Sequence, residues 1–280
     1  MENSVKRILV PLDPSIYAEA ATETACRIAK VHGASVGGVV VLDSLEIQSS
    51  IVPTIGLYYP MMVDAVTNRN QHAQKILVDC MDRFATICEK AGVKHFETEW
   101  DGLPSQRLLE SSISYDLIVM GLKTFFHFET RGGNGNCLSE LLDETITPIL
   151  AVPAKGVADS TSVLVTFDGS LVSARALHDF ARFAAPFNPE VVVIVAEKEE
   201  REAKFLLDEA KMYLAAHGIK NVTSVHHASP IESILSDGYI DDFDLIVAGI
   251  HSKKRVKDFF VGSFTKSLIS AGTKPLFLSH

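Results

Sequence analysis

The sequence predicts an α/β protein made of two tandem doubly wound parallel sheets, and three observations support this prediction. Short runs of valine, leucine and isoleucine alternate with segments that carry apolar residues at helical spacing. Such alternation is typical of parallel strands buried between two layers of helices. The same alternation occurs twice along the chain. The chain has 280 residues, a length that suits two domains of ordinary size.

An internal repeat underlies the double pattern. The segments 6–13 (KRILVPLD) and 161–168 (TSVLVTFD) are short apolar runs that end in an aspartate, and they lie 155 residues apart. Further on, DLIVMG at 116–121 matches DLIVAG at 244–249, with a separation of only 128 residues. A tandem duplication in which the first copy has gained residues is the simplest explanation.

The extra length of the first copy is placed at residues 44–66, a segment without a counterpart in the second copy. This segment is unusually apolar, and its prolines argue against one long regular helix. The small and polar residues near 154–161 mark the junction of the copies. We therefore expect a first domain at 1–156 and a second domain at 157–280.

The elements of each half follow in the order strand, helix, strand, helix, strand, helix, strand, helix, strand. In the first half, residues 14–33 form an amphipathic helix that stops at Gly33, and the strand 34–43 follows. The helix 171–186 and the strand 190–197 repeat this arrangement. Strand–helix–strand units of this kind predict right-handed connections and a parallel sheet with helices on both faces.

Composition and charge exclude several function classes. The formal charge of −9 and the pI near 5.6 argue against nucleic acid or an anionic membrane surface as the main partner. No run approaches the roughly 18 apolar residues of a membrane span, and Pro11 and Asp13 make the first apolar run too short for a signal peptide. The four cysteines show no CxxC spacing, so we expect buried thiols in a cytoplasmic protein.

The segment 244–265 (DLIVAGIHSKKRVKDFFVGSFT) carries the clearest binding signal. Its apolar run predicts a buried strand that ends at Gly249, and a new helix is predicted to begin near Gly262 and Ser263. A glycine at the carboxyl end of a strand allows close approach of a ligand. The free N–H groups at the start of a helix attract an anion. The combination indicates a site for a nucleotide phosphate.

The spacing of Gly249, Ser252, Gly262 and Ser263 resembles the nucleotide loop of the universal stress protein family, in which Gly-x2-Gly-x9-Gly is followed by Ser or Thr. The chain departs from that pattern at Ser252, which replaces the second glycine. The resemblance covers both copies, so the chain is identified as a tandem universal stress protein. It implies the adenine nucleotide alpha hydrolase-like fold, and adenine nucleotide as ligand, with ATP accompanied by Mg²⁺ and no dedicated metal site.

The resemblance also implies which residues hold the nucleotide. In this family an aspartate after the first strand and its neighbouring backbone contact the nucleoside, and the glycine loop contacts the phosphates. The alternative for Asp168 is a helix cap assisted by Ser170. The residues expected at the site of the second half are Thr166, Asp168, Ala196, Gly249, Ser252, Gly262, Ser263, Phe264 and Thr265.

The first half keeps part of this set but has an altered loop. Thr124 stands at the second glycine position, and Asn136 replaces the serine after the third glycine. We therefore expect this half to bind nucleotide weakly or not at all. Its corresponding residues are Pro11, Asp13, Val41, Gly121 and Gly135.

Three hypotheses about function follow. The first is a stress-response regulatory protein that binds ATP in its second half and acts on an unknown partner. The second is a slow ATPase, although no residue is evident as a general base and no catalytic residue is assigned. The third is an interaction or apolar-ligand module that works through residues 44–66 without nucleotide.

The final strands of the halves predict how the halves associate. The segments 148–153 (PILAVP) and 275–280 (PLFLSH) are short apolar strands, and in the family such strands pair between domains. One chain can then form its own pseudo-dimer. Whether whole chains pair further as a homodimer stays open.

Overall fold

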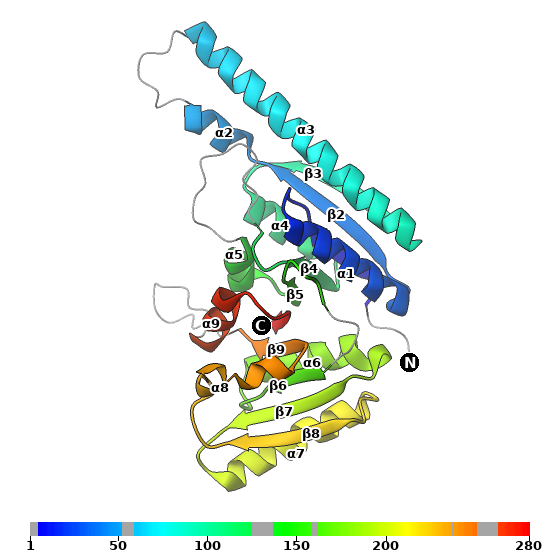
Figure 1. The fold of residues 1–280 in the computed structure, drawn as a ribbon, viewed down its shortest axis with the longest axis vertical. Helices are drawn as coiled ribbons and strands as arrows, with labels where there is room; N and C mark the ends of the chain where they lie inside the picture. The colour runs from blue at the N-terminus through cyan, green and yellow to red at the C-terminus, as the bar shows by residue number, and fades with distance from the viewer. Residues whose placement is uncertain (1–4, 52–58, 125–136, 158–161, 237, 251–262) are drawn as a thin grey trace.

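The structure, a computed structural model shown in Figure 1, describes residues 5–51, 59–124, 137–157, 162–236, 238–250 and 263–280. The strands of the first half are β1 (Arg7–Pro11), β2 (Ser35–Leu42), β3 (His95–Asp101), β4 (Leu117–Gly121) and β5 (Ile149–Val152). Those of the second half are β6 (Ser162–Thr166), β7 (Glu190–Ala196), β8 (Val222–His227), β9 (Leu245–Gly249) and β10 (Leu276–Ser279).

Helices connect these strands in both halves. The helices of the first half are α1 (Ile16–His32), α2 (Ser44–Ile51), α3 (Tyr59–Ala91), α4 (Pro104–Ser112) and α5 (Cys137–Glu144). The second half contains α6 (Leu171–Ala184), η1 (Ala185–Phe187), α7 (Glu200–Ala216), α8 (Ser233–Ser236), η2 (Tyr239–Asp242) and α9 (Ser263–Ala271).

The strands of the described residues form one continuous ten-stranded sheet in the order β3-β2-β1-β4-β5-β10-β9-β6-β7-β8. Within each half the first strand lies between the second and the fourth, and these neighbours are parallel. The order of the strands therefore reverses beside β1 and beside β6, as in doubly wound folds. The predicted pair of doubly wound parallel sheets is confirmed.

The seam between the halves is an antiparallel pairing of β5 with β10. Ala151 pairs with Leu276 and Leu150 pairs with Phe277. This pairing removes two exposed sheet edges, which explains why both strands are apolar and fully buried. The predicted intramolecular pseudo-dimer is confirmed.

Local sequence explains where the first helix of each half begins. The Ser15 hydroxyl accepts the Ala18 N–H at the start of α1, and the Ser170 hydroxyl accepts the Ser173 N–H at the start of α6. Helix α1 ends at Gly33, whose φ of 67° is the left-handed conformation of a C-terminal glycine cap. The predicted end of this helix is confirmed.

The extra segment of the first half forms α2 and the beginning of α3. Helix α3 has 33 residues against 17 in α7, its counterpart, and its beginning extends past the sheet at the end of the molecule far from the second half (Figure 1). The described parts of segment 44–66 belong to two helices, α2 and α3, which is consistent with the expectation that no single long helix covers the segment. Pro60 is the second residue of α3, where its missing N–H costs no helical hydrogen bond.

The later turns of α3 pack against α1 and β2 through Leu77, Phe84 and Cys88, which are buried. A Cβ on Gly38 of β2 would lie 2.8 Å from the Phe84 ring, so the glycine makes room for this ring. All four cysteines are free and buried, as expected. Among the helices of the described residues, none combines the length and apolar character that crossing a membrane requires.

Candidate functional site

A pocket of about 230 Å³ opens at the carboxyl ends of β6, β7 and β9 in the second half. This edge lies beside the point where the strand order reverses, which is where doubly wound sheets hold their ligands. The pocket also touches the first turn of α6, the segment before α8 and the first turn of α9. Its lining residues are Thr166, Phe167, Asp168, Ser173, Ala196, Ile231, Glu232, Ala248, Gly249, Phe264 and Thr265.

Asp168 has a structural role in the turn that enters α6. Its carboxylate Oδ1 accepts the Ser170 N–H at 3.0 Å, and its own N–H donates to the Ser173 hydroxyl at 3.4 Å. Ser170 is the residue that caps the helix, so Asp168 supports the cap from two residues upstream. The side chain of Asp168 nevertheless stays exposed at the pocket, which leaves it accessible to a ligand.

Gly249 brings the end of β9 and the start of α6 together. A Cβ at this position would lie 2.9 Å from both the Val172 carbonyl carbon and the Ser173 nitrogen. The glycine is thus required for the approach of helix backbone to strand backbone. The Thr265 hydroxyl donates to the Gly249 carbonyl at 3.3 Å, which ties the start of α9 to the same strand end.

The structure brings most of the expected site residues of the second half together. Ser263 is the first residue of α9, beside the pocket residues Phe264 and Thr265. Ser252 and Gly262 lie outside the described residues. The expected residues that line the pocket itself are Thr166, Asp168, Ala196, Gly249, Phe264 and Thr265.

Sequence reasoning missed five lining residues, Phe167, Ser173, Ile231, Glu232 and Ala248. Ser173 had a usable signal, because the third residue after a helix cap returns toward the strand from which the chain came. Ile231 and Glu232 follow β8, whose carboxyl end lies at the same edge of the sheet as those of β6 and β7. Because ligands of doubly wound sheets lie at the carboxyl ends of the strands, the residues after β8 could have been expected at the site.

The corresponding residues of the first half are buried. Pro11, Val41 and Gly121 are buried, and Asp13 is only 4% exposed. A Cβ on Gly121 would collide with the Tyr17 Cβ and lie 2.8 Å from the Thr124 hydroxyl. Gly135, the fifth expected residue of this half, lies outside the described residues.

The described part of the chain contains no recognisable metal-binding cluster. Within those residues, no group of three or more His, Cys, Asp or Glu side chains is arranged to hold a metal ion. The carboxylates of the pocket are Asp168 and Glu232. Their oxygens are suited to accept hydrogen bonds from hydroxyl groups.

Fold and pocket together define an open α/β protein with a pocket at the carboxyl edge of a doubly wound sheet, where proteins of this class hold their ligands. The chain belongs to the universal stress protein family, whose sequence profile matches residues 4–125 and 189–280. A comparison with curated proteins finds no significant match.

Solved structures support the tandem architecture over the whole length. A universal stress protein from Archaeoglobus fulgidus is similar with a TM-score of 0.71 at 20% identity, covering 99% of this chain and 98% of that one. A functionally unknown protein from Pseudomonas aeruginosa gives a TM-score of 0.61 at 13% identity, covering 99% and 93% of the two chains. At these identities the similarity concerns the fold.

Proposed function

We propose that the second half binds an adenine nucleotide, ATP with Mg²⁺, and that the chain is a stress-response regulatory protein. The observation that carries this proposal is the pocket at the carboxyl ends of β6, β7 and β9, beside the reversal of strand order. Family membership supports it, because the nucleotide-loop pattern that the chain resembles begins at Gly249, a residue of that pocket.

The chemistry of the lining suits the nucleoside end of the ligand. A volume of about 230 Å³ is below the usual range for a drug-sized molecule, so the pocket accommodates a base and ribose rather than a whole nucleotide. Asp168 and Glu232 accept hydrogen bonds from the ribose hydroxyls in this arrangement. The phosphates then lie outward, near the N–H groups at the start of α9.

The role that we propose for the pocket is binding. Asp168 and Glu232 are the ionisable side chains of its described lining, and both accept hydrogen bonds from ribose hydroxyls in the proposed arrangement. We therefore propose that the bound nucleotide acts as a signal, and that an unidentified regulatory partner distinguishes the nucleotide-bound chain from the free chain.

The test is a calorimetric titration of the full chain with ATP and Mg²⁺, with Asp168→Asn as the informative variant. Asparagine keeps the acceptor that supports the Ser170 turn but loses the negative charge. A charged hydrogen bond is worth about 1.5–3 kcal/mol, so we expect one site per chain and at least tenfold weaker binding by the variant.

The matched control is Asp13→Asn, the same change at the corresponding position of the first half. We expect it to leave ATP affinity unchanged, because Asp13 is buried against its own turn. Absence of ATP binding by the unaltered chain contradicts the proposal. Weaker binding by Asp13→Asn, with Asp168→Asn unaffected, contradicts the assignment of the site to the second half.

A further inference from the structure

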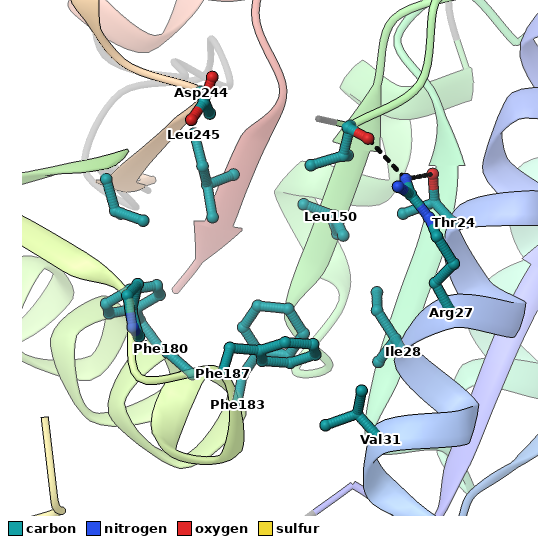
Figure 2. Close-up of a pocket in the computed structure, with 14 residues that line it drawn as sticks. Thr24, Arg27, Ile28, Val31, Leu150, Phe180, Phe183, Phe187, Asp244 and Leu245 are labelled. Atoms are coloured by element: carbon teal, nitrogen blue, oxygen red, sulfur yellow. Dashed lines mark hydrogen bonds between the residues drawn. The ribbon is translucent and has the colours of Figure 1, made fainter. Parts of the chain in front are cut away.

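A second cavity, of about 260 Å³, lies between the two halves (Figure 2). Ile28 and Val31 of α1 face Phe183 and Phe187 of the second half across the space. Leu150 of β5 lies between these two walls. None of its lining residues belongs to the segment 44–66 or to the pocket at Asp168.

Polar groups at the border of the cavity are already bonded within the protein. The Thr24 hydroxyl donates to the Ala20 carbonyl at 2.8 Å, and the Arg27 guanidinium donates to the Val157 carbonyl at 2.6 Å. The Asp244 carboxylate accepts the Ser162 N–H at 3.0 Å. An ordered water needs two to four polar partners. The internal bonds reduce the number of hydrogen bonds that the walls of the cavity can offer a water. The lining therefore offers a ligand mainly apolar surface.

The phenylalanine rings that line the cavity come from the second half only. Phe183 lies 5.4 Å from Phe187 and 5.2 Å from Phe277 between ring centroids. The repeat places Ile28 at the position that corresponds to Phe183, so an aliphatic wall with Ile28 and Val31 faces an aromatic wall with Phe183 and Phe187. A flat ring or an alkyl chain inserted between them contacts both faces.

We propose that this cavity is a binding site for a small uncharged apolar molecule, an alkyl chain or an aromatic ring, held between the two halves. The border carries a guanidinium and a carboxylate, Arg27 and Asp244, so it offers no net charge to select an ionic ligand. The cavity would therefore select its ligand by shape and by apolar contact with its two walls. The site is independent of the nucleotide pocket, because the two share no lining residue.

The experiment titrates the full chain with N-phenyl-1-naphthylamine, an uncharged fluorophore that brightens in apolar surroundings. Val31→Trp is the informative variant, because Val31 is 43% exposed at the cavity and a larger ring there fills the space at little cost to folding. Val78→Trp is the matched control, because Val78 is a helical valine that is 41% exposed and lies outside the cavity.

We expect saturable binding at one site, at least tenfold weaker in Val31→Trp and unchanged in Val78→Trp. Phe187→Ala is a second variant that removes an aromatic wall instead of filling the space, and we expect weaker binding there too. Non-saturable binding by the unaltered chain, or equal affinity in Val31→Trp and the unaltered chain, overturns the proposal.

Competition identifies the kind of apolar ligand. Displacement of the fluorophore by 1-decanol supports an alkyl chain, and displacement by naphthalene supports an aromatic ring. Failure of both to displace it overturns the proposal. The Val31→Trp and Phe187→Ala effects must persist with ATP present, because a loss of the difference would place the fluorophore in the nucleotide pocket.

Discussion

The two halves share one scaffold, yet the aspartates that follow their first strands differ in accessibility. Asp168 is exposed at a pocket of about 230 Å³, whereas Asp13, its counterpart, is 4% exposed. Both carboxylates accept the N–H of the serine two residues later, at 3.0 Å and 3.1 Å respectively. The duplicated aspartate therefore preserves a turn in both halves, and accessibility to a ligand is a separate property.

Three hydroxyl groups distinguish the two sites further. Thr166, Ser173 and Thr265 line the pocket of the second half. The repeat places Pro11, Ala18 and Leu138 at these positions, and all three are buried. The two halves therefore carry different chemistry at corresponding positions, with hydroxyl groups in the second half and apolar side chains in the first.

The largest expected effect concerns the glycine at the end of the fourth strand of each half, Gly121 in β4 and Gly249 in β9. Gly249→Ala places a methyl group 2.9 Å from the backbone of Val172 and Ser173, and overpacking of this kind costs about 1–3 kcal/mol. Gly121→Ala meets Tyr17 in the same way. Urea denaturation is expected to show reduced stability for both variants. Unchanged stability in either variant would contradict the packing role of that glycine.

An intermediate effect is expected at Ser173, whose counterpart in the first half is Ala18. Ser173→Ala removes a hydroxyl that lines the pocket and accepts the Asp168 N–H. The loss of one hydrogen bond of about 1 kcal/mol predicts roughly five- to tenfold weaker ATP binding by calorimetry. The converse change, Ala18→Ser in the first half, is expected to create no second site. A second ATP per chain in that variant would show that the first half is closed by one methyl group alone.

The smallest effect concerns the helix ends at the seam, where His32 stands opposite Phe183 and Phe187. Burial lowers the pKa of His32 below its ordinary value of 6.5, so the unfolded chain takes up a proton more readily than the folded one. The stability that this difference contributes is fully present above pH about 6.5 and is lost as the pH falls below it.

His32→Phe gives α1 the residue that Phe187 supplies in the second half. We expect the free energy of unfolding to fall less steeply between pH about 7 and 5.5 in this variant. Chemical denaturation at a series of pH values measures the slope. An equal slope in the variant and the unaltered chain would assign the pH dependence to other groups, such as His178, whose pKa burial also lowers.

Local sequence was sufficient for the fold because its signals act over short distances. The alternation of apolar runs and amphipathic segments, the caps Ser15 and Gly33 and the internal repeat predicted the tandem parallel sheets. The resemblance to the family's nucleotide loop and strand ends also named six residues that line one pocket. The length of α3, which has 33 residues, was not predicted from the sequence.

The amino-acid sequence by itself determined the order of strands and helices along the chain, the parallel sheets and the glycine at the end of β9. Each of these depends on neighbouring residues or on a repeated pattern. Tertiary structure alone decided which aspartate is accessible and that Gly249 accommodates a helix. It alone also placed an apolar cavity between α1 and α6. Accessibility and cavities depend on how segments far apart in the chain fill space against one another, and periodicity in one segment carries no information about that.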